Sequence, residues 1–419
     1  MIIQKHRLIS IFILLIAILS VAPLIHAYSG IALINNTTIG WIIKSLFLVT
    51  VIFSINSYSH KRQLQMLFWV SLYLSWNVIC IVRGAFIAEN YWDYKGLITN
   101  ALALCVPLVA YCSVNSILVK KIIKFLIIYT TLTFILILPI MPTDAYGFYL
   151  VPFSLILLFI GPLNNKCKLF LIVISLFVIF SDFGARSNVI KFVVPLILGM
   201  FYYFRTYFSL SLLNSIRIAL FACPIILFSL ASFGTFNVFK ISTYIEGNYT
   251  QTRFDMKGDK TEDNLTADTR TFLYLDVLST ASLNDSWYFG RSPARGNISE
   301  HFGEQDMTGR NERLGNEVAI LNVFTWTGLI GCVLLFLVYY KASFLAINNS
   351  DNVFSKILGL FLAFRWAYAW VEDVNNFSLN HVFLWVLIGM CYSTSFRKMT
   401  DYEFKVWVID LFRFKIRYS

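Results

Sequence analysis

Residues 317–340 read EVAILNVFTWTGLIGCVLLFLVYY, and this run indicates the kind of fold that the chain adopts. After Glu317 it is almost wholly apolar and about twenty residues long, a length that crosses roughly 30 Å of hydrocarbon as an α-helix. A helix is favoured in that setting because it satisfies its own backbone hydrogen bonds. The run therefore predicts a membrane-spanning helix that begins at an acidic residue.

Similar apolar runs occupy most of the chain. Of its 419 residues 58% are hydrophobic and 14% are charged, against about 25% charged residues in a typical soluble domain. We expect an all-α integral membrane protein with about twelve transmembrane helices, the first of them an uncleaved anchor. The predicted segments lie near residues 8–28, 39–58, 64–83, 97–118, 122–141, 146–163, 169–184, 188–205, 212–234, 317–340, 354–371 and 378–396.

The basic residues of the short loops predict the orientation. Cytoplasmic loops carry an excess of Lys and Arg. With the N-terminus inside, alternate short segments and the C-terminal tail hold nineteen basic residues, whereas the opposite short loops hold only Arg83, Lys95, Arg186 and Lys191. Both termini are therefore predicted to be cytoplasmic, with the long loop outside.

One long polar stretch interrupts the apolar pattern. Residues 236–315 contain nine Arg or Lys and twelve Asp or Glu. We divide the chain into helices 1–9 (1–235), a large outer loop (236–316), helices 10–12 (317–396) and a basic tail (397–419). Short inter-helix connections need only a few residues, so a loop of this length suggests a function at the membrane surface.

Several classes of function lose their usual support. The net charge of +11 is spread by topology rather than gathered in one patch, which argues against nucleic-acid binding. None of the seven cysteines falls in the long loop, so neither a disulfide framework nor a zinc site is indicated there. No Walker, dinucleotide or His-Glu-x-x-His motif occurs.

Within the loop, residues 247–264 are rich in Asp, Thr and Gly and predict a flexible surface segment. Residues 268–278 predict an amphipathic helix capped by Asp268, with Phe272, Leu275 and Leu278 on one face. A helix of this kind suits the membrane surface.

Arginines on the outer side are candidates for binding phosphate, because guanidinium forks pair with phosphate oxygens. Arg186 lies in the predicted turn 183–188; either it extends toward lipid head groups or it binds an anion. Solvated turns are the alternative for the loop arginines. The candidates for a diphosphate site are Arg186, Arg270, Arg291, Arg295 and Arg313.

Carboxylates near the same boundary are candidate proton acceptors. Glu317 is the first choice, although a carboxylate at a helix N-terminus is also favoured by the helix dipole. Asp268 is the second catalytic candidate. Arg365, Glu372 and His381 are secondary candidates, and Asp373 lies beside Glu372 as a further candidate at the outer end of the eleventh predicted span. For Arg365 a structural pair with Glu372, or a contact with a neighbouring helix, is the alternative.

These features resemble a known family. Ala185-Arg186-Ser187, Asp268-Thr269-Arg270, Phe289-Gly290-Arg291-Ser292 and Asn-Glu-x3-Leu-Asn-x5-Gly-Leu-Ile-Gly over residues 316–331 are similar to the bacterial O-antigen polymerase (Wzy-type) family, within the O-antigen polymerase and ligase superfamily. The resemblance implies a GT-C-like membrane glycosyltransferase of the bacterial inner membrane that uses no metal or other cofactor. Its substrate would be an undecaprenyl-diphosphate-linked oligosaccharide. Membrane lipids, a chain-length regulator and a flippase of the same pathway would be its partners.

The same resemblance separates polymerase from ligase. Ligases carry a His eleven positions before the first Gly of Gly-Leu-Ile-Gly, and in this chain that position is Glu317. The difference favours a polymerase, which transfers the growing glycan to an incoming lipid-linked repeat. A ligase, a lipid-linked oligosaccharide flippase and a non-enzymatic membrane protein stay as alternatives; against the flippase, nine predicted helices precede the loop, three follow it, and no internal repeat occurs.

Overall fold

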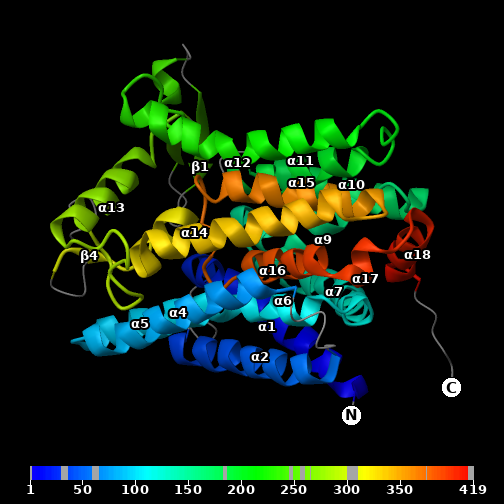
Figure 1. The fold of residues 1–419 in the computed structure, drawn as a ribbon, viewed down its shortest axis with the longest axis horizontal. Coiled ribbons are helices and arrows are strands. Elements are labelled where there is room, and N and C mark those ends of the chain that lie inside the picture. The colour runs from blue at the N-terminus through cyan, green and yellow to red at the C-terminus, as the bar shows by residue number, and fades with distance from the viewer. Residues whose placement is uncertain are drawn as a thin grey trace.

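The computed structural model of the protein describes residues 2–29, 36–58, 66–182, 186–244, 249–254, 260–264, 266–299, 310–373 and 375–413. This part of the chain is mostly helical (Figure 1). The helices are α1 (Ile2–Ser29), α2 (Thr37–Tyr58), α4 (Phe68–Ile87), α5 (Tyr91–Cys105), α6 (Val109–Ser113), α7 (Ser116–Ile137), α8 (Tyr146–Tyr149), α9 (Val151–Ile156), α10 (Asn165–Ser181), α11 (Arg186–Met200), α12 (Leu210–Ser232), α13 (Thr271–Leu283), α14 (Ala319–Asn348), α15 (Val353–Tyr368), α16 (Leu379–Tyr392), α17 (Thr394–Arg397) and α18 (Asp401–Leu411). Short 3₁₀ turns lie at Val106–Leu108, Leu138–Ile140, Thr143–Ala145, Leu157–Phe159 and Ile241–Thr243.

Six helical stretches among the described residues are long and apolar enough to cross a membrane. They are Thr37–Ile55, Phe68–Ile87, Tyr91–Ser113, Ser116–Ile140, Leu210–Ser232 and Ala319–Asn348. Their exposed side chains include many Leu, Ile, Val and Phe; outward apolar side chains suit a lipid environment, because lipid tails are as apolar as they are. The expectation of a helical, membrane-embedded protein is confirmed.

Other predicted segments form shorter or broken helices. Residues 146–163 fold as α8, α9 and a 3₁₀ turn, with Pro152 at the start of α9. The helix α11 has 15 residues and contains Pro195, which removes an internal hydrogen bond. Apolarity alone did not reveal these breaks.

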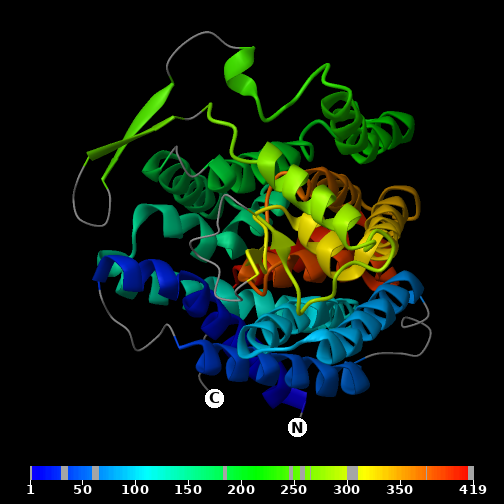
Figure 2. The same cartoon turned by 90° about the vertical axis from the view of Figure 1, so that its left-hand side faces the viewer.

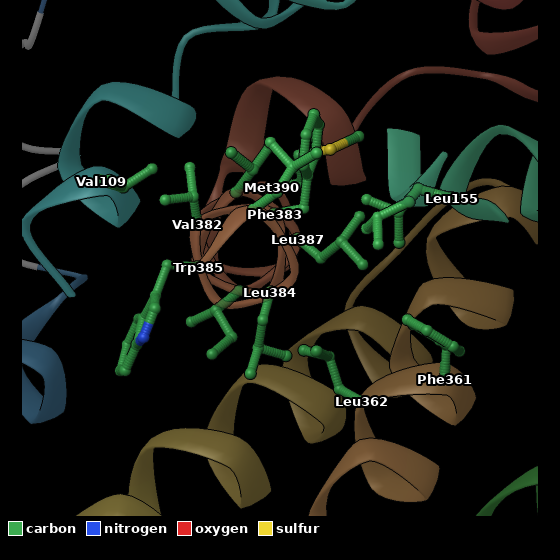
Figure 3. Close-up of a cluster of buried hydrophobic side chains, with 14 of the residues drawn as sticks. Val109, Leu155, Phe361, Leu362, Val382, Phe383, Leu384, Trp385, Leu387 and Met390 are labelled. Carbon is green, nitrogen blue, oxygen red and sulfur yellow. The ribbon is translucent and has the colours of Figure 1, made fainter. Parts of the chain in front are cut away.

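The helix α16 lies at the centre of the fold. It has only 14 residues, and nearly all of them are buried. Figure 3 shows its side chains pointing outward in every direction, toward Val109 of α6, Leu155 of α9 and Phe361 and Leu362 of α15. A short helix that is apolar on every face is typical of a protein core.

The polar stretch gathers at one end of the bundle. In Figure 1, α13 and the strand β4 (Glu312–Arg313) lie at the left-hand end, whereas α17 and α18 lie at the right-hand end. Two small antiparallel ribbons add to the predicted helices: β4 pairs with β3 (Asn297–Ile298), and β1 (Thr250–Phe254) pairs with β2 (Lys260–Asn264). The segment predicted to be flexible, 247–264, thus contains the β1–β2 ribbon, which stands apart from the helices in Figure 2; residues 247–248 and 255–259 of it lie outside the described part.

The C-terminal region is also ordered by packing. We predicted residues 397–419 as a basic tail, but α18 begins with a capping box between Thr400 and Glu403. Phe404, Trp407 and Leu411 of α18 are buried against the bundle. Burying such side chains contributes about 1.5–3 kcal/mol each, which fixes this helix to the end opposite α13.

Candidate active site

Asp268 accepts backbone hydrogen bonds at the beginning of α13. Its Oδ1 accepts the backbone N–H groups of Arg270 at 3.1 Å and Thr271 at 3.0 Å. Burial by itself would raise the pKa of Asp268, but the hydrogen bonds from Thr271 and Arg270 lower the pKa below its ordinary value. The helix begins at Thr271, three residues later than predicted, and continues to Leu283. The catalytic role of Asp268 stays a prediction.

Glu317 lies between two arginines. Arg270 Nη1 donates to Glu317 Oε2 at 2.6 Å, and Arg313 Nη2 donates to Glu317 Oε1 at 3.2 Å. Arg270 Nε also donates to the carbonyl of Val371 at 3.2 Å, and its Nη2 lies 3.9 Å from Glu372. Four predicted site residues, from three separate segments, therefore meet at one place.

Backbone contacts between α14 and α15 hold Glu317 there. The first N–H groups of a helix have no acceptor within it. Here Ala319 N–H donates to the carbonyl of Glu372 at 3.1 Å, and Ile320 N–H donates to that of Ala369 at 3.0 Å. The N-terminus of α14 is thus docked on the C-terminal end of α15, which places Glu317 beside Glu372.

Three buried asparagines complete this junction. Asn322 Nδ2 donates to the carbonyl of Asn316 at 2.8 Å, while Asn316 N–H donates to Asn322 Oδ1 at 2.6 Å. Asn375 Nδ2 donates to the carbonyl of Ala319 at 3.0 Å. Side-chain amides provide both donors and acceptors, so they fix the turn that carries Glu317 without adding charge.

A cavity of about 260 Å³ opens next to this junction. Glu317, Arg313 and Asp373 line it, together with Asn316 and Trp326. The Asn316 Nδ2 and Trp326 Nε1 atoms are buried and have no acceptor among the described residues. Buried donors are usually paired, so these two groups next to the cavity lack the partners that such donors ordinarily have.

Asp373 is the second carboxylate of the cavity. Its Oδ1 accepts the N–H of Asn375 at 3.1 Å, and no described cation lies within ion-pair distance of it. Burial raises the pKa of Asp373 to about 6, the N–H of Asn375 opposes this, and the charge of Glu372 adds to it. A carboxylate with a pKa near neutrality is suited to accept a proton from a substrate.

Arg291 and Arg295 lie in a second cluster, around Glu312. Arg291 Nη2 donates to Glu312 Oε1 at 2.9 Å, and Arg295 donates through Nη2 at 2.8 Å and Nε at 3.2 Å. The Gly296 N–H reaches the same carboxylate at 3.3 Å, and Arg310 Nε lies 3.6 Å from it. Burial alone would raise the pKa of Glu312, but the bonds and charges of Arg295 and Arg291 lower it. Their diphosphate role stays a prediction; in the structure both hold a carboxylate whose side chain is only 2% exposed.

The same cluster is joined to the beginning of α5. Arg310 contacts the fully buried carboxylate of Asp93 through Nη2, and its Nη1 lies 3.1 Å from Glu89. Arg83 Nη2 donates to the carbonyls of Phe289 at 2.6 Å and Gly290 at 2.8 Å. Charged side chains at the adjoining ends of α4 and α5 thus fix the polar stretch onto the bundle.

The loop that carries Arg291 packs against a kink in α14. Gly328 interrupts the helix with φ +69°, and the loop backbone takes over the missing hydrogen bonds. Leu329 N–H donates to the carbonyl of Trp287 at 2.8 Å, and Arg291 N–H donates to that of Thr325 at 2.6 Å. A Cβ on Gly328 would lie 2.2 Å from the Tyr288 carbonyl oxygen, so only glycine fits this approach.

The remaining predicted residues lie elsewhere. Arg186 is the first residue of α11, and residues 183–185 of its predicted turn lie outside the described part. Arg365 is 4% exposed and lies over the Tyr368 ring at 5.7 Å; it forms no ion pair with Glu372. His381 Nε2 accepts from Trp385 Nε1 at 2.9 Å inside α16.

Two residues of the site, Glu312 and Lys191, were not among the predicted candidates. The side chain of Glu312 is only 2% exposed and binds Arg291 and Arg295. Lys191, whose side chain is 3% exposed, lies 3.9 Å from Glu372. Lys191 could have been found from the sequence, because it is a basic residue in a short loop that was predicted to be outside. Nothing in the sequence indicated that Glu312 is buried.

The fold and site define a membrane-embedded helical protein with a polar cavity at one end of its bundle. No three His, Cys, Asp or Glu side chains of the described residues gather as metal ligands do. Comparisons with models of protein families and with curated proteins find no match to this chain.

Proposed function

We propose that the protein is a membrane glycosyltransferase that polymerises lipid-linked oligosaccharide repeat units, as its resemblance to the O-antigen polymerases implies. The growing glycan would pass from undecaprenyl diphosphate to the non-reducing end of an incoming lipid-linked repeat. The observation that carries this proposal is the cavity in which Glu317 and Asp373 meet Arg313, at the end of a bundle of apolar helices.

The groups at this cavity match the two requirements of the reaction. The bond between the anomeric carbon and the diphosphate oxygen breaks, and its electron pair stays with the diphosphate. Arg313 and Arg270, held in place by Glu317, would stabilise the charge that develops there. The acceptor hydroxyl forms the new glycosidic bond and gives its proton to a carboxylate.

Two carboxylates compete for that proton. Glu317 was predicted from sequence, but both of its carboxylate oxygens are bound by guanidiniums, and half of its side chain is exposed. Asp373, with its raised pKa, holds a proton more readily near neutral pH. We therefore assign proton transfer to Asp373 and the positioning of the arginines to Glu317.

The proposal includes the topology predicted from charge. Twelve spans with both termini in the cytoplasm would place residues 236–316 in the periplasm of a bacterium, above the inner membrane. The position of α13 and α18 at opposite ends of the bundle supports this (Figure 1). A chain-length regulator and a flippase would be functional partners.

Deletion of the gene tests the function. Surface glycan is separated on a gel, and lipid-linked intermediates are extracted in parallel. Surface lipid that carries a single repeat in place of a ladder supports the polymerase. Polymer that accumulates on the lipid carrier would indicate a ligase, and single repeats confined to the cytoplasmic leaflet would indicate a flippase.

A further inference from the structure

An apolar groove of about 330 Å³ lies beside the candidate active site. Its walls come from the C-terminal half of α12, from α13 and from the end of α15. Aromatic and aliphatic side chains dominate it, among them Phe228, Ala231, Tyr274, Leu278, Phe364 and Val371. One wall, α12, is a membrane-span candidate, whereas α13 belongs to the polar stretch. The groove therefore joins the apolar bundle to the polar end of the molecule.

The walls of the groove are held together by specific contacts. The Tyr274 hydroxyl donates to the carbonyl of Trp370 at 2.5 Å, and the Tyr274 ring lies 5.8 Å from those of Phe228 and Phe239. Packed aromatic rings of this kind add about 0.5–1.5 kcal/mol each beyond their burial. The groove is a built feature of the packing rather than a gap beside one side chain.

Apart from Trp370 Nε1, which is buried and has no acceptor among the described residues, the few polar groups of the groove are satisfied. Asn237 Nδ2 donates to Thr271 Oγ1 at 2.9 Å, and Ser232 Oγ donates to the carbonyl of Phe228 at 2.9 Å. A peptide in the groove would bring backbone N–H and C=O groups that find no partners there, at a cost of several kcal/mol for each one desolvated. A chain without hydrogen-bonding groups meets no such penalty.

The polar end of the groove carries a cation. Thr271 and Val371 line the groove, and Arg270 precedes the first and donates to the carbonyl of the second at 3.2 Å. The same guanidinium contacts Glu317, which lines the active-site cavity. A ligand with an apolar chain and an anionic head would thus find an apolar surface with a guanidinium at its end.

We propose that this groove binds the isoprenoid chain of the lipid-linked substrate, with the first phosphates of the chain held at Arg270. The proposal rests on the proposed function for the identity of the lipid. It assigns a role to α13 that the reaction alone does not require: α13 forms the outer wall that holds the lipid chain next to the cavity.

The test uses the full chain in lipid nanodiscs and a polyprenyl diphosphate that carries a diazirine on its isoprenoid chain. After irradiation, the labelled peptides are mapped. We expect labels on residues 223–239 and 271–278, with competition by unlabelled polyprenyl diphosphate and at least tenfold weaker competition by phosphatidylglycerol. Equal competition by the two lipids would mean that the groove holds bilayer lipid, and would overturn the proposal.

Matched variants test whether the isoprenoid chain binds in the groove. Ala231→Trp on α12 and Ala367→Trp on α15 fill the groove from opposite walls, and we expect each to reduce labelling of the groove at least tenfold. Ala219→Trp, on the exposed face of α12 outside the groove, is the control and should label like the wild type. Unchanged labelling in both groove variants, with both proteins monodisperse, contradicts the proposal.

Glycan transfer is measured on the same samples, which separates the two proposals. Specific labelling of the groove without glycan transfer would support the lipid-binding site and contradict the proposed polymerase function. If Ala231→Trp loses labelling but transfers glycan at the wild-type rate, the proposed enzymatic function stands and the role of the groove in binding the substrate lipid is contradicted.

Discussion

Arg270 and Glu317, which are 47 positions apart in the chain, form an ion pair with a distance of 2.6 Å between Nη1 and Oε2. The pair joins the beginning of α13 to the beginning of α14. With Arg313 on its other oxygen, Glu317 holds two cations, and Arg313 lines the cavity with it.

Glu317→Gln should reduce glycan transfer while leaving the fold intact. The glutamine keeps the size of the side chain but weakens its hold on Arg270 and Arg313, and a loss of about 0.2–1 kcal/mol of stability is expected for a partly exposed pair. We expect transfer to fall about tenfold, and no change in the pH at which the rate is half-maximal. A loss of more than a hundredfold would return the proton-accepting role to Glu317.

Asp373→Asn should reduce transfer by about 10²–10⁴-fold and remove the acidic limb of the pH profile of the residual rate. Because the pKa of Asp373 is about 6, the wild-type rate should fall as the pH drops below 6, when the carboxylate is protonated. The charges of Glu372 and Lys191 act on Asp373, and Glu317 and Arg313 line the same cavity. General-base contributions are typically about 10²–10⁴-fold, and transfer is measured from pH 5 to pH 9.

Asp373→Asn should lower the rate of transfer but raise the stability of the fold. The folded-state pKa of Asp373 is raised above its unfolded value, so ionisation of this carboxyl opposes folding and stability is lost as pH rises from about 4 to 6. Asp373→Asn should therefore raise the thermal midpoint at pH 8 and change it little at pH 4. A lower midpoint at pH 8 would show that the carboxylate stabilises the fold.

Glu312→Gln should destabilise the protein strongly. It leaves Arg291 and Arg295 buried with one neutral partner, and breaking a buried ion pair costs about 3–5 kcal/mol. Glu89→Gln is the matched control: Glu89 contacts Arg310 and Arg295, but its side chain is 68% exposed, so about 0–1 kcal/mol is expected. Thermal unfolding in detergent measures both, and equal midpoints would contradict the structural role of Glu312.

The low pKa of Glu312 gives this cluster a pH dependence. A carboxyl whose pKa is depressed in the folded state contributes stability above its unfolded pKa, and that contribution is lost as pH falls through the folded value. The stability gap between wild type and Glu312→Gln should therefore narrow as the pH falls below about 4.

Gly328→Ala should disrupt the contact between α14 and the Arg291 loop. The added methyl would meet the backbone of Tyr288 and Gly290, and the positive φ of 69° adds strain, typically about 1–3 kcal/mol. Gly40→Ala, at a helix position with open space around its Cβ, should be neutral or slightly stabilising. Similar thermal midpoints for the two variants would contradict the close approach.

Apolar composition by itself determined the class of fold. Runs of about twenty apolar residues leave a helix in hydrocarbon as the main solution, and six helical stretches of the described residues are long and apolar enough to cross a membrane. Composition did not reveal that residues 146–163 break into short pieces or that α16 is buried on every side, because an apolar face does not show whether its neighbour is lipid or protein.

The sequence likewise identified Glu317, Arg270 and Arg313 as outer charged residues, since charges near hydrocarbon are costly and conspicuous. Only the tertiary structure decided which charges meet. Arg291 and Arg295 face Glu312, whereas Arg270 and Arg313 face Glu317, and Asp373 reaches the cavity because the end of α15 caps the start of α14. Ion pairs depend on distances between segments remote in sequence, and those distances are set by the packing of the helices.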